Sequence, residues 1–137
     1  MSLAIENLIP HRAPMCWLNE LTACTETTAT ATAIFGEHDF AVADGKVLET
    51  ALVECVAQTV AAALGQRARA GQGSGQAAAN GMLIAASNFK ISSRPPAGRT
   101  LHIEIRETKR LGPMLLVAGT ITCDGKIVAT GELSLYA

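Results

Sequence analysis

The sequence predicts an α+β fold in which one long central helix is wrapped by a curved antiparallel sheet. Apolar side chains recur at three- and four-residue steps over residues 47–69 and cover most of a helical circumference. Segments that alternate apolar and polar residues stand before and after this helix. Because a helix that is apolar on most sides must be enclosed by other elements, one sheet curved around it is the expected arrangement.

The first part of the chain predicts a short leading segment and a β-hairpin. Residues 1–12 contain Pro10, which disfavours helix in the residue before it. Met15–Cys24 is largely apolar, and Thr25–Ile34 alternates threonine with alanine. Alternation with β-branched residues is typical of a half-buried strand, so we expect these two segments to pair.

A loop rich in glycine, aspartate and histidine, Phe35–Lys46, precedes the predicted helix Val47–Arg69. We expect Asp44 or Gly45 to cap the start of this helix. Small side chains on the helix let a sheet approach closely. Those expected to do so are Ala57 and Ala61, and the polar stripe at four-residue spacing consists of Thr50, Glu54 and Gln58.

The rest of the chain predicts a flexible connection followed by β structure. The connection is residues 70–79, which are rich in glycine, glutamine and alanine. Asp124-Gly125 between two β-like runs is a strong hairpin signal. The four strands expected to form an antiparallel meander are Met82–Lys90, Arg99–Lys109, Met114–Cys123 and Lys126–Tyr136.

Composition and charge exclude several classes of protein. The chain of 137 residues has a net charge of −1, and its lysines and arginines are scattered, so we expect no nucleic-acid partner. The sequence has neither a run long enough for a membrane span nor the basic and apolar regions of a signal peptide. The four cysteines form no CxxC pair and have no histidine at ligand spacing, so we expect no metal. Buried free thiols in a reducing cytoplasm are expected at Cys16, Cys24, Cys55 and Cys123.

Four short motifs follow one another over nearly the whole chain. They are Leu8–Met15, Val53–Gln58, the pair Asn88-Phe89-Lys90 and Arg94-Pro95-Pro96-Ala97-Gly98, and Asp124–Ala129. In these motifs the chain resembles the hotdog-fold 3-hydroxyacyl-acyl-carrier-protein dehydratases of the FabA/FabZ type. The resemblance implies that residues 1–137 form a single hotdog domain, and that two such domains pair into a dimer with one continuous sheet.

The resemblance also implies a reaction and its partners. The substrate would be a 3-hydroxyacyl chain on the phosphopantetheine of acyl carrier protein, and loss of water would give the trans-2-enoyl thioester in fatty-acid or polyene synthesis. Two active sites would lie at the dimer interface, each with a tunnel for the acyl chain and without a metal or redox cofactor. A homodimer, or a higher assembly of dimers, is the implied state.

The family assigns roles to specific side chains. A histidine in a His-Phe-Pro-Gly loop takes the C2 proton, a carboxylate on the partner's central helix handles the departing hydroxyl, and the helix N-terminus polarises the thioester carbonyl. The helix motif assigns the carboxylate to Glu54. A loop insertion of about two residues assigns the base to His38, whereas ungapped counting from Glu54 places Phe40 there. The substrate-binding positions implied are His11, Gly45 and Gln58, and His11 is either a structural anchor or the alternative base.

The chain also departs from the family pattern. It has no His-Phe-Pro-Gly sequence and no proline before the helix. In this it is similar to a divergent branch, the dehydratase-like proteins encoded with aryl-polyene-type gene clusters. A heterodimer with a more orthodox dehydratase is therefore a further expected assembly.

The chemistry fits these residue types. An imidazole titrates near neutral pH and suits the base, and a carboxyl group in an apolar tunnel is pushed toward its protonated form and suits the acid. Three alternatives stay open. Thr50, Glu54 and Gln58 form a plain solvent-facing stripe; the protein is an acyl thioesterase, which the fold also supports; or it is a non-catalytic subunit of a dehydratase heterodimer.

Overall fold

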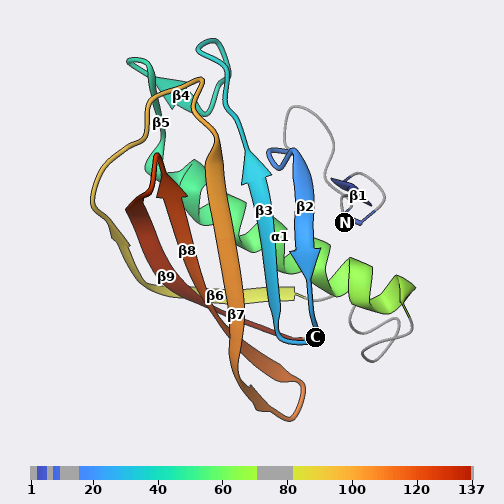
Figure 1. The fold of residues 1–137 in the computed structure, drawn as a ribbon. Coiled ribbons are helices and arrows are strands. Elements are labelled where there is room, and N and C mark those ends of the chain that lie inside the picture. Colours follow the sequence, from blue (N-terminus) through green and yellow to red (C-terminus); the bar gives the residue numbers. More distant parts are fainter. Residues whose placement is uncertain (1–2, 6–7, 10–15, 71–81, 137) are drawn as a thin grey trace.

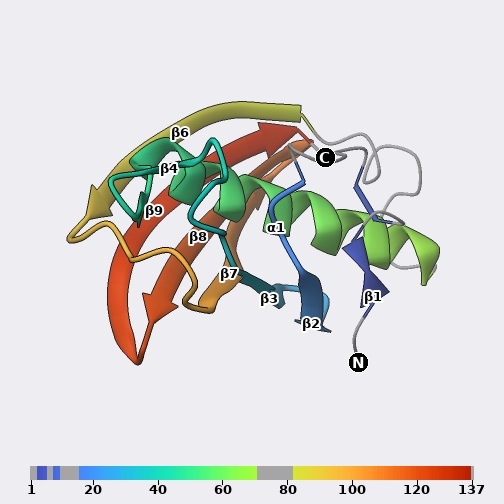
Figure 2. The ribbon, with the colours of Figure 1, turned by 90° about the horizontal axis from the view of Figure 1, so that it is seen from above.

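The computed structural model describes residues 3–5, 8–9, 16–70 and 82–136. Helix α1 (Glu49–Arg69) lies against one face of a seven-stranded antiparallel sheet with the strand order β1-β2-β3-β7-β8-β9-β6 (Figure 1). Figure 2 shows the sheet curving around the helix. The predicted architecture is therefore confirmed. The strands are β1 (Leu3–Ala4), β2 (Glu20–Cys24), β3 (Thr28–Ala33), β6 (Met82–Ile91), β7 (Leu101–Leu111), β8 (Met114–Cys123) and β9 (Lys126–Tyr136), and β4 (Val42–Ala43) pairs with β5 (Lys46–Val47) in a separate ribbon.

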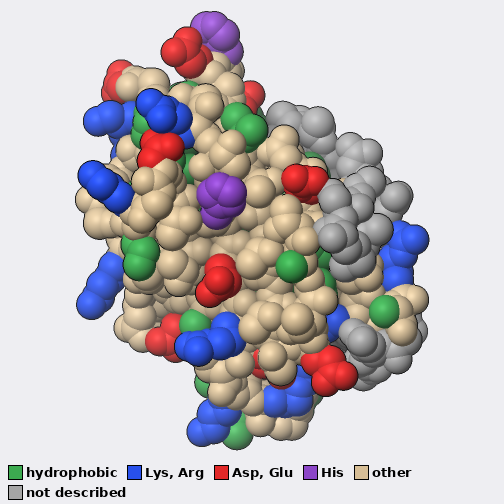
Figure 3. Space-filling model, viewed as in Figure 1, with side chains coloured by type: hydrophobic (Ala, Val, Ile, Leu, Met, Phe, Trp, Pro, Cys, Tyr) green, Lys and Arg blue, Asp and Glu red, His purple; other side chains and the backbone are tan. Residues whose placement is uncertain are grey.

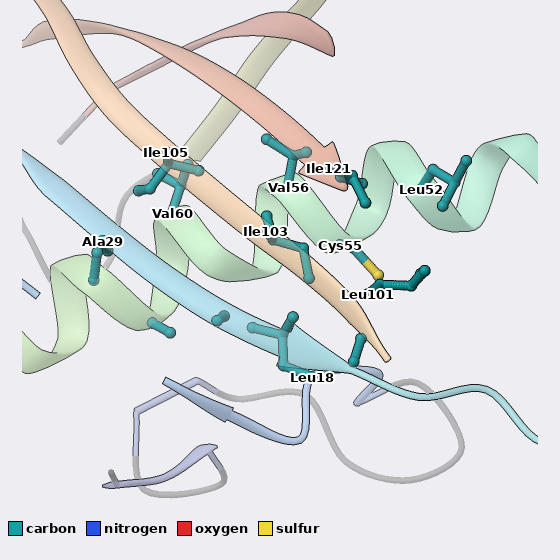
Figure 4. Close-up of a cluster of buried hydrophobic side chains, with 14 of the residues drawn as sticks. Leu18, Ala29, Leu52, Cys55, Val56, Val60, Leu101, Ile103, Ile105 and Ile121 are labelled. Atoms are coloured by element: carbon teal, nitrogen blue, oxygen red, sulfur yellow. The ribbon is translucent and has the colours of Figure 1, made fainter. Parts of the chain in front are cut away.

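The core lies between α1 and the inward-facing side chains of the sheet. On β3 and the first half of β7 every second residue is buried, as the alternating sequence predicts. Val56 and Val60 on the helix lie among Ile103, Ile105 and Ile121 of the sheet (Figure 4). Burial of each such side chain contributes about 1.5–3 kcal/mol to folding, so this contact is the main source of stability at the centre of the molecule.

A glycine of the sheet allows a close approach to the helix. A Cβ atom added at Gly119 of β8 would lie 2.5 Å from Cγ1 of Val56. Ala57 and Ala61 are only partly buried, although they pack against the core as expected. Fully buried alanines of the helix are Ala51, Ala62 and Ala63.

The predicted meander of four strands is wrong in one connection. Strand β6 pairs with β9, whereas β7 lies between β3 and β8 and so has no free edge for β6. Short turns force β7, β8 and β9 to be neighbours, with Gly112 and Gly125 in the left-handed region. The connection from β6 to β7 spans residues 92–100 and imposes no such constraint.

The predicted cap of the helix is also wrong. Asp44 and Gly45, with φ of 56° and 74°, form the two-residue turn between β4 and β5. Val47 belongs to β5, and the helix is preceded by Leu48, whose extended backbone (φ −68°, ψ 147°) occupies the N-cap without a side-chain hydrogen bond. The tight turn needs residues that tolerate positive φ. The two residues that we expected at the cap meet this need, so they lie in the turn and not at the helix start.

Several other sequence-based predictions can be compared with the described residues. Cys55 and Cys123 are buried, but Cys16 and Cys24 are only half-buried, so the expectation of four buried thiols is wrong for two of them.

No helix in the described ranges is long and apolar enough to cross a membrane. The leading segment around Pro10 and most of the connection at 70–79 lie outside the described residues.

Candidate functional site

The polar stripe of α1 turns inward at one residue. Only 1% of the surface of Gln58 is exposed, Glu54 is half-buried, and Thr50 is exposed. The interpretation of this stripe as plainly solvent-facing is therefore wrong at Gln58. A buried amide must find hydrogen-bond partners, because an unpaired one costs about 1–3 kcal/mol.

Gln58 finds partners on both sides. Its Oε1 accepts a hydrogen bond from the backbone N–H of Trp17 at 2.9 Å. Its Nε2 donates to Oε1 of Glu54 at 3.4 Å. The backbone of residue 17 thus orients the Gln58 amide, and the amide in turn holds the Glu54 carboxyl group at the edge of the core.

Trp17 also lines a cavity of about 450 Å³. The indole ring is 5.8 Å, centroid to centroid, from the rings of both Phe35 and Phe40. Phe40 is 57% exposed, and His38 is exposed beside it. The cavity is lined by Cys16, Trp17, Leu18, Asn19, Ile34, Phe35, His38, Asp39 and Phe40.

The structure brings some of the predicted site residues together and leaves others apart. Glu54 and Gln58 are in contact. His38 lies on the aromatic cavity, and the lining of that cavity does not include Glu54. Gly45 lies at the exposed tip of the β4–β5 turn, and His11 lies outside the described residues.

Sequence reasoning did not identify Trp17 as part of the site. Its backbone orients Gln58 and the residue also lines the cavity, so it connects the helix residues to the loop of His38. A lone tryptophan three residues before a strand gives little signal for such a role. The contact joins residues 17 and 58, which are far apart in the sequence.

Cys55 lies next to Glu54 in the sequence but faces the core. Burial, and secondarily the charge of Glu54, raise the pKa of the Cys55 thiol from 9.0 to about 12. A thiol with such a pKa is not a nucleophile near neutral pH, so its assignment to core packing is confirmed. Within the described ranges, no group of three or more histidine, cysteine, aspartate or glutamate residues is placed to hold a metal ion.

The outer face of the sheet carries mixed charges. Figure 3 shows acidic and basic side chains interspersed between wide areas of other residues on this face. Threonines from β2, β3 and β8 line a shallow depression together with His102 and Glu104. His102 is exposed, as its outward position on β7 predicts.

Comparison with known proteins identifies relatives of this chain. A family described as ApeP dehydratase, ApeP-like, matches residues 3–137. No curated protein matches the sequence. One solved structure is the dehydratase heterocomplex ApeI:P from Xenorhabdus doucetiae, which is 21% identical, with a TM-score of 0.82 over 98% of this chain and 90% of that one.

Other solved structures share the fold at lower identity. The PaaI protein of the phenylacetic acid degradation operon from E. coli is 14% identical, with a TM-score of 0.69 over 85% of this chain and 81% of that one. A hypothetical thioesterase with coenzyme A from Streptococcus pneumoniae is 11% identical, with a TM-score of 0.68 over 85% and 83%. These similarities confirm the hotdog fold.

Proposed function

Because this chain belongs to the ApeP-like dehydratase family, we propose that it acts on 3-hydroxyacyl thioesters of acyl carrier protein and eliminates water to give the trans-2-enoyl thioester, in fatty-acid or polyene synthesis. The observation that carries the proposal is the chain of hydrogen bonds from the Trp17 backbone through Gln58 to Glu54. These bonds orient a carboxyl group on a largely apolar helix, at the position where the resemblance expects the acid.

The elimination needs two proton transfers. A base removes a proton from C2, the electron pair of that C–H bond forms the C2–C3 double bond, and the C3 hydroxyl leaves as water after accepting a proton from an acid. We assign the acid to Glu54 and the base to His38. Because the cavity at His38 does not include Glu54 of the same chain, the two groups would meet at a substrate bound between subunits.

The thioester carbonyl would be polarised by the start of α1. The first N–H groups of a helix carry partial positive charge, and here no side chain in the described residues caps them. Gly45, Gln58 and His11 are proposed substrate-binding residues, with His11 as the alternative base. The reaction moves protons without net oxidation or reduction, so it requires no redox cofactor.

The sheet offers an edge for assembly. Strand β6 is the last strand in the sheet order, and among the described residues it pairs on one side only, with β9. Unpaired edges invite another strand, so we expect two chains to pair there into a homodimer or a larger assembly of dimers. We expect this assembly in the cytoplasm, where it would meet acyl carrier protein.

A second candidate function is that of a non-catalytic subunit in a dehydratase heterodimer. Ungapped counting places Phe40 where related enzymes have their histidine, and the Phe40 ring lies 5.8 Å from that of Trp17. The similar structure from Xenorhabdus doucetiae is described as a heterocomplex. In this alternative the β6 edge would receive a different, catalytic dehydratase chain.

The test is dehydration of a 3-hydroxyacyl thioester by the full chain, alone and mixed with a cognate dehydratase. Glu54→Gln keeps the shape of the side chain and removes its proton, so we expect turnover to fall by about 10²–10⁴-fold. His38→Ala should lower turnover by a similar factor. Glu104→Gln, an exposed glutamate on β7, is the matched control and should leave the rate unchanged.

Each result separates the candidates. Loss of activity only with Glu54→Gln would mean that another base acts, with His11 next to be tested. Release of free thiol without enoyl product would identify a thioesterase instead. If the chain binds a dehydratase stably and both variants leave the activity of that complex unchanged, only the non-catalytic role remains.

A further inference from the structure

A short segment outside the helix holds the loop that leads into α1. We call Arg94–Gly98 the strap. The carbonyl of Pro95 accepts a hydrogen bond from Val47 N at 2.9 Å, and Ala97 N donates to the carbonyl of Gly45, also at 2.9 Å. Gly98 N donates to the carbonyl of Phe35 at 2.8 Å. The strap therefore follows this loop from its beginning to the β4–β5 ribbon.

The side chain of Arg94 adds three further bonds at the helix end of this loop. Its Nε donates to the carbonyl of Val47 at 3.0 Å. Its Nη2 donates to the carbonyls of Ala43 at 2.7 Å and Lys46 at 2.9 Å. A guanidinium is suited to this, because its planar fork of donors can meet several acceptors in fixed directions.

These contacts fix the start of the helix through the backbone carbonyls of the residues that precede it. The bonded carbonyls all lie within the five residues before Leu48. Leu48 N donates to the carbonyl of Ala41 at 2.8 Å. Helices are usually started by a side chain that accepts hydrogen bonds from the first N–H groups. Here the N-cap residue makes no such bond.

We propose that Arg94 is a positioning residue: it fixes the start of α1 through backbone carbonyls, so that no side chain needs to occupy the N–H groups that would meet the substrate thioester. The inference rests on the proposed function for the role of those N–H groups. Its structural part, that Arg94 determines the position of residues 41–48, stands on the three hydrogen bonds alone.

The experiment combines amide hydrogen exchange with steady-state kinetics on Arg94→Ala and Arg94→Lys in the full chain, with the cognate dehydratase added if turnover requires it. Arg94→Ala should accelerate exchange of the Val47 and Leu48 amides by about tenfold or more, because local opening becomes easier. It should lower kcat by about 10²-fold at nearly constant KM, as expected for misplacement of a group that acts in the transition state. Arg94→Lys keeps the charge without the fork and should lie between.

Arg99→Ala is the matched control. Arg99 lies just after the strap and bonds only a side chain, that of Asp124, in the described contacts. It should change neither exchange at residues 41–48 nor kcat. Unchanged exchange in Arg94→Ala would overturn the positioning role, and so would faster exchange with an unchanged kcat. If the unmodified protein shows no turnover, the proposed function fails, and the exchange result still decides whether Arg94 holds the helix start.

Discussion

The middle and the start of α1 are stabilised in different ways. Along its length the helix is held by apolar packing, with Gly119 leaving only enough room for Val56. At its start it is held by hydrogen bonds from Arg94 and the strap to backbone carbonyls and amides. Apolar packing depends on the volumes of the side chains and tolerates small changes in their orientation. The hydrogen bonds of a guanidinium depend on the direction from each donor to its acceptor. The packed region supplies stability, and the bonded region supplies the orientation that a reaction would need.

The largest expected effect breaks the packed region. Gly119→Val would place a Cβ atom 2.5 Å from Cγ1 of Val56, and the branched side chain has no space beyond it. Although valine is favoured in strands by up to about 1 kcal/mol, we expect overpacking to dominate and to lower the free energy of unfolding by about 3 kcal/mol. Urea denaturation measures this.

The neighbouring residue provides the control for that substitution. Ala118→Val adds volume on the outer face of the same strand, where Ala118 is half-buried, and should change stability by less than about 1 kcal/mol. Equal effects of the two substitutions would show that the helix does not limit the space at Gly119.

An intermediate effect concerns alkaline pH and the packed region. Burial raises the pKa of the Cys55 thiol to about 12, against 9.0 for an exposed thiol. Below pH 9 both states keep the proton and the thiol contributes its full stability. Between pH 9 and about 12 only the unfolded chain loses it, so stability falls as pH rises, by up to about 1.4 kcal/mol per pH unit.

Cys55→Ala isolates this contribution. Below pH 9 the variant should be less stable because it leaves a small cavity, and its stability should fall less steeply than that of the unmodified protein between about pH 9 and 11. Chemical denaturation at several pH values across this range gives both slopes. Parallel curves for the two proteins would mean that Cys55 is already accessible to water in the folded state.

The smallest expected effect is at the surface beside the strap. Arg99 and Asp124 form an ion pair at 3.1 Å, but both side chains are more than half exposed. Water and salt screen such a pair, so Arg99→Ala should lower the free energy of unfolding by at most about 0.5 kcal/mol. A loss above about 1 kcal/mol would mean that the strap region contributes to global stability and not only to orientation.

Two Asp-Gly turns show where sequence reasoning succeeds and where it stops. Asp124-Gly125 stands between two long β-like runs that predict a hairpin, and its backbone φ angles of 52° and 78° confirm the turn. Asp44-Gly45 forms an equivalent turn, but its flanking strands are two residues each and a helix follows directly. Such short strands leave no alternation to detect, so a helix cap is the simpler interpretation of the sequence.

The site shows the same division. Glu54 and Gln58 can be selected from their motif and four-residue spacing, and their contact follows from helix geometry. That Gln58 points inward, and that the backbone of Trp17 meets it there, depends on how β2 and its preceding residues pass the helix. Arg94 lies in a recognised motif, yet its three hydrogen-bond acceptors belong to residues about 50 positions earlier in the sequence. No local sequence pattern predicts such a contact.

The sequence by itself determined that one apolar helix would be enclosed by an antiparallel sheet. The helical and two-residue spacings of its apolar residues indicate which side of each element is buried. It also determined the short turn at Asp124-Gly125, which requires residues that tolerate positive φ. Only the tertiary structure decided that β6 joins β9 and that the strap holds the start of α1. Both are contacts between distant segments that depend on which edges and carbonyls remain unpaired after the local elements have formed, and local periodicity carries no information about that.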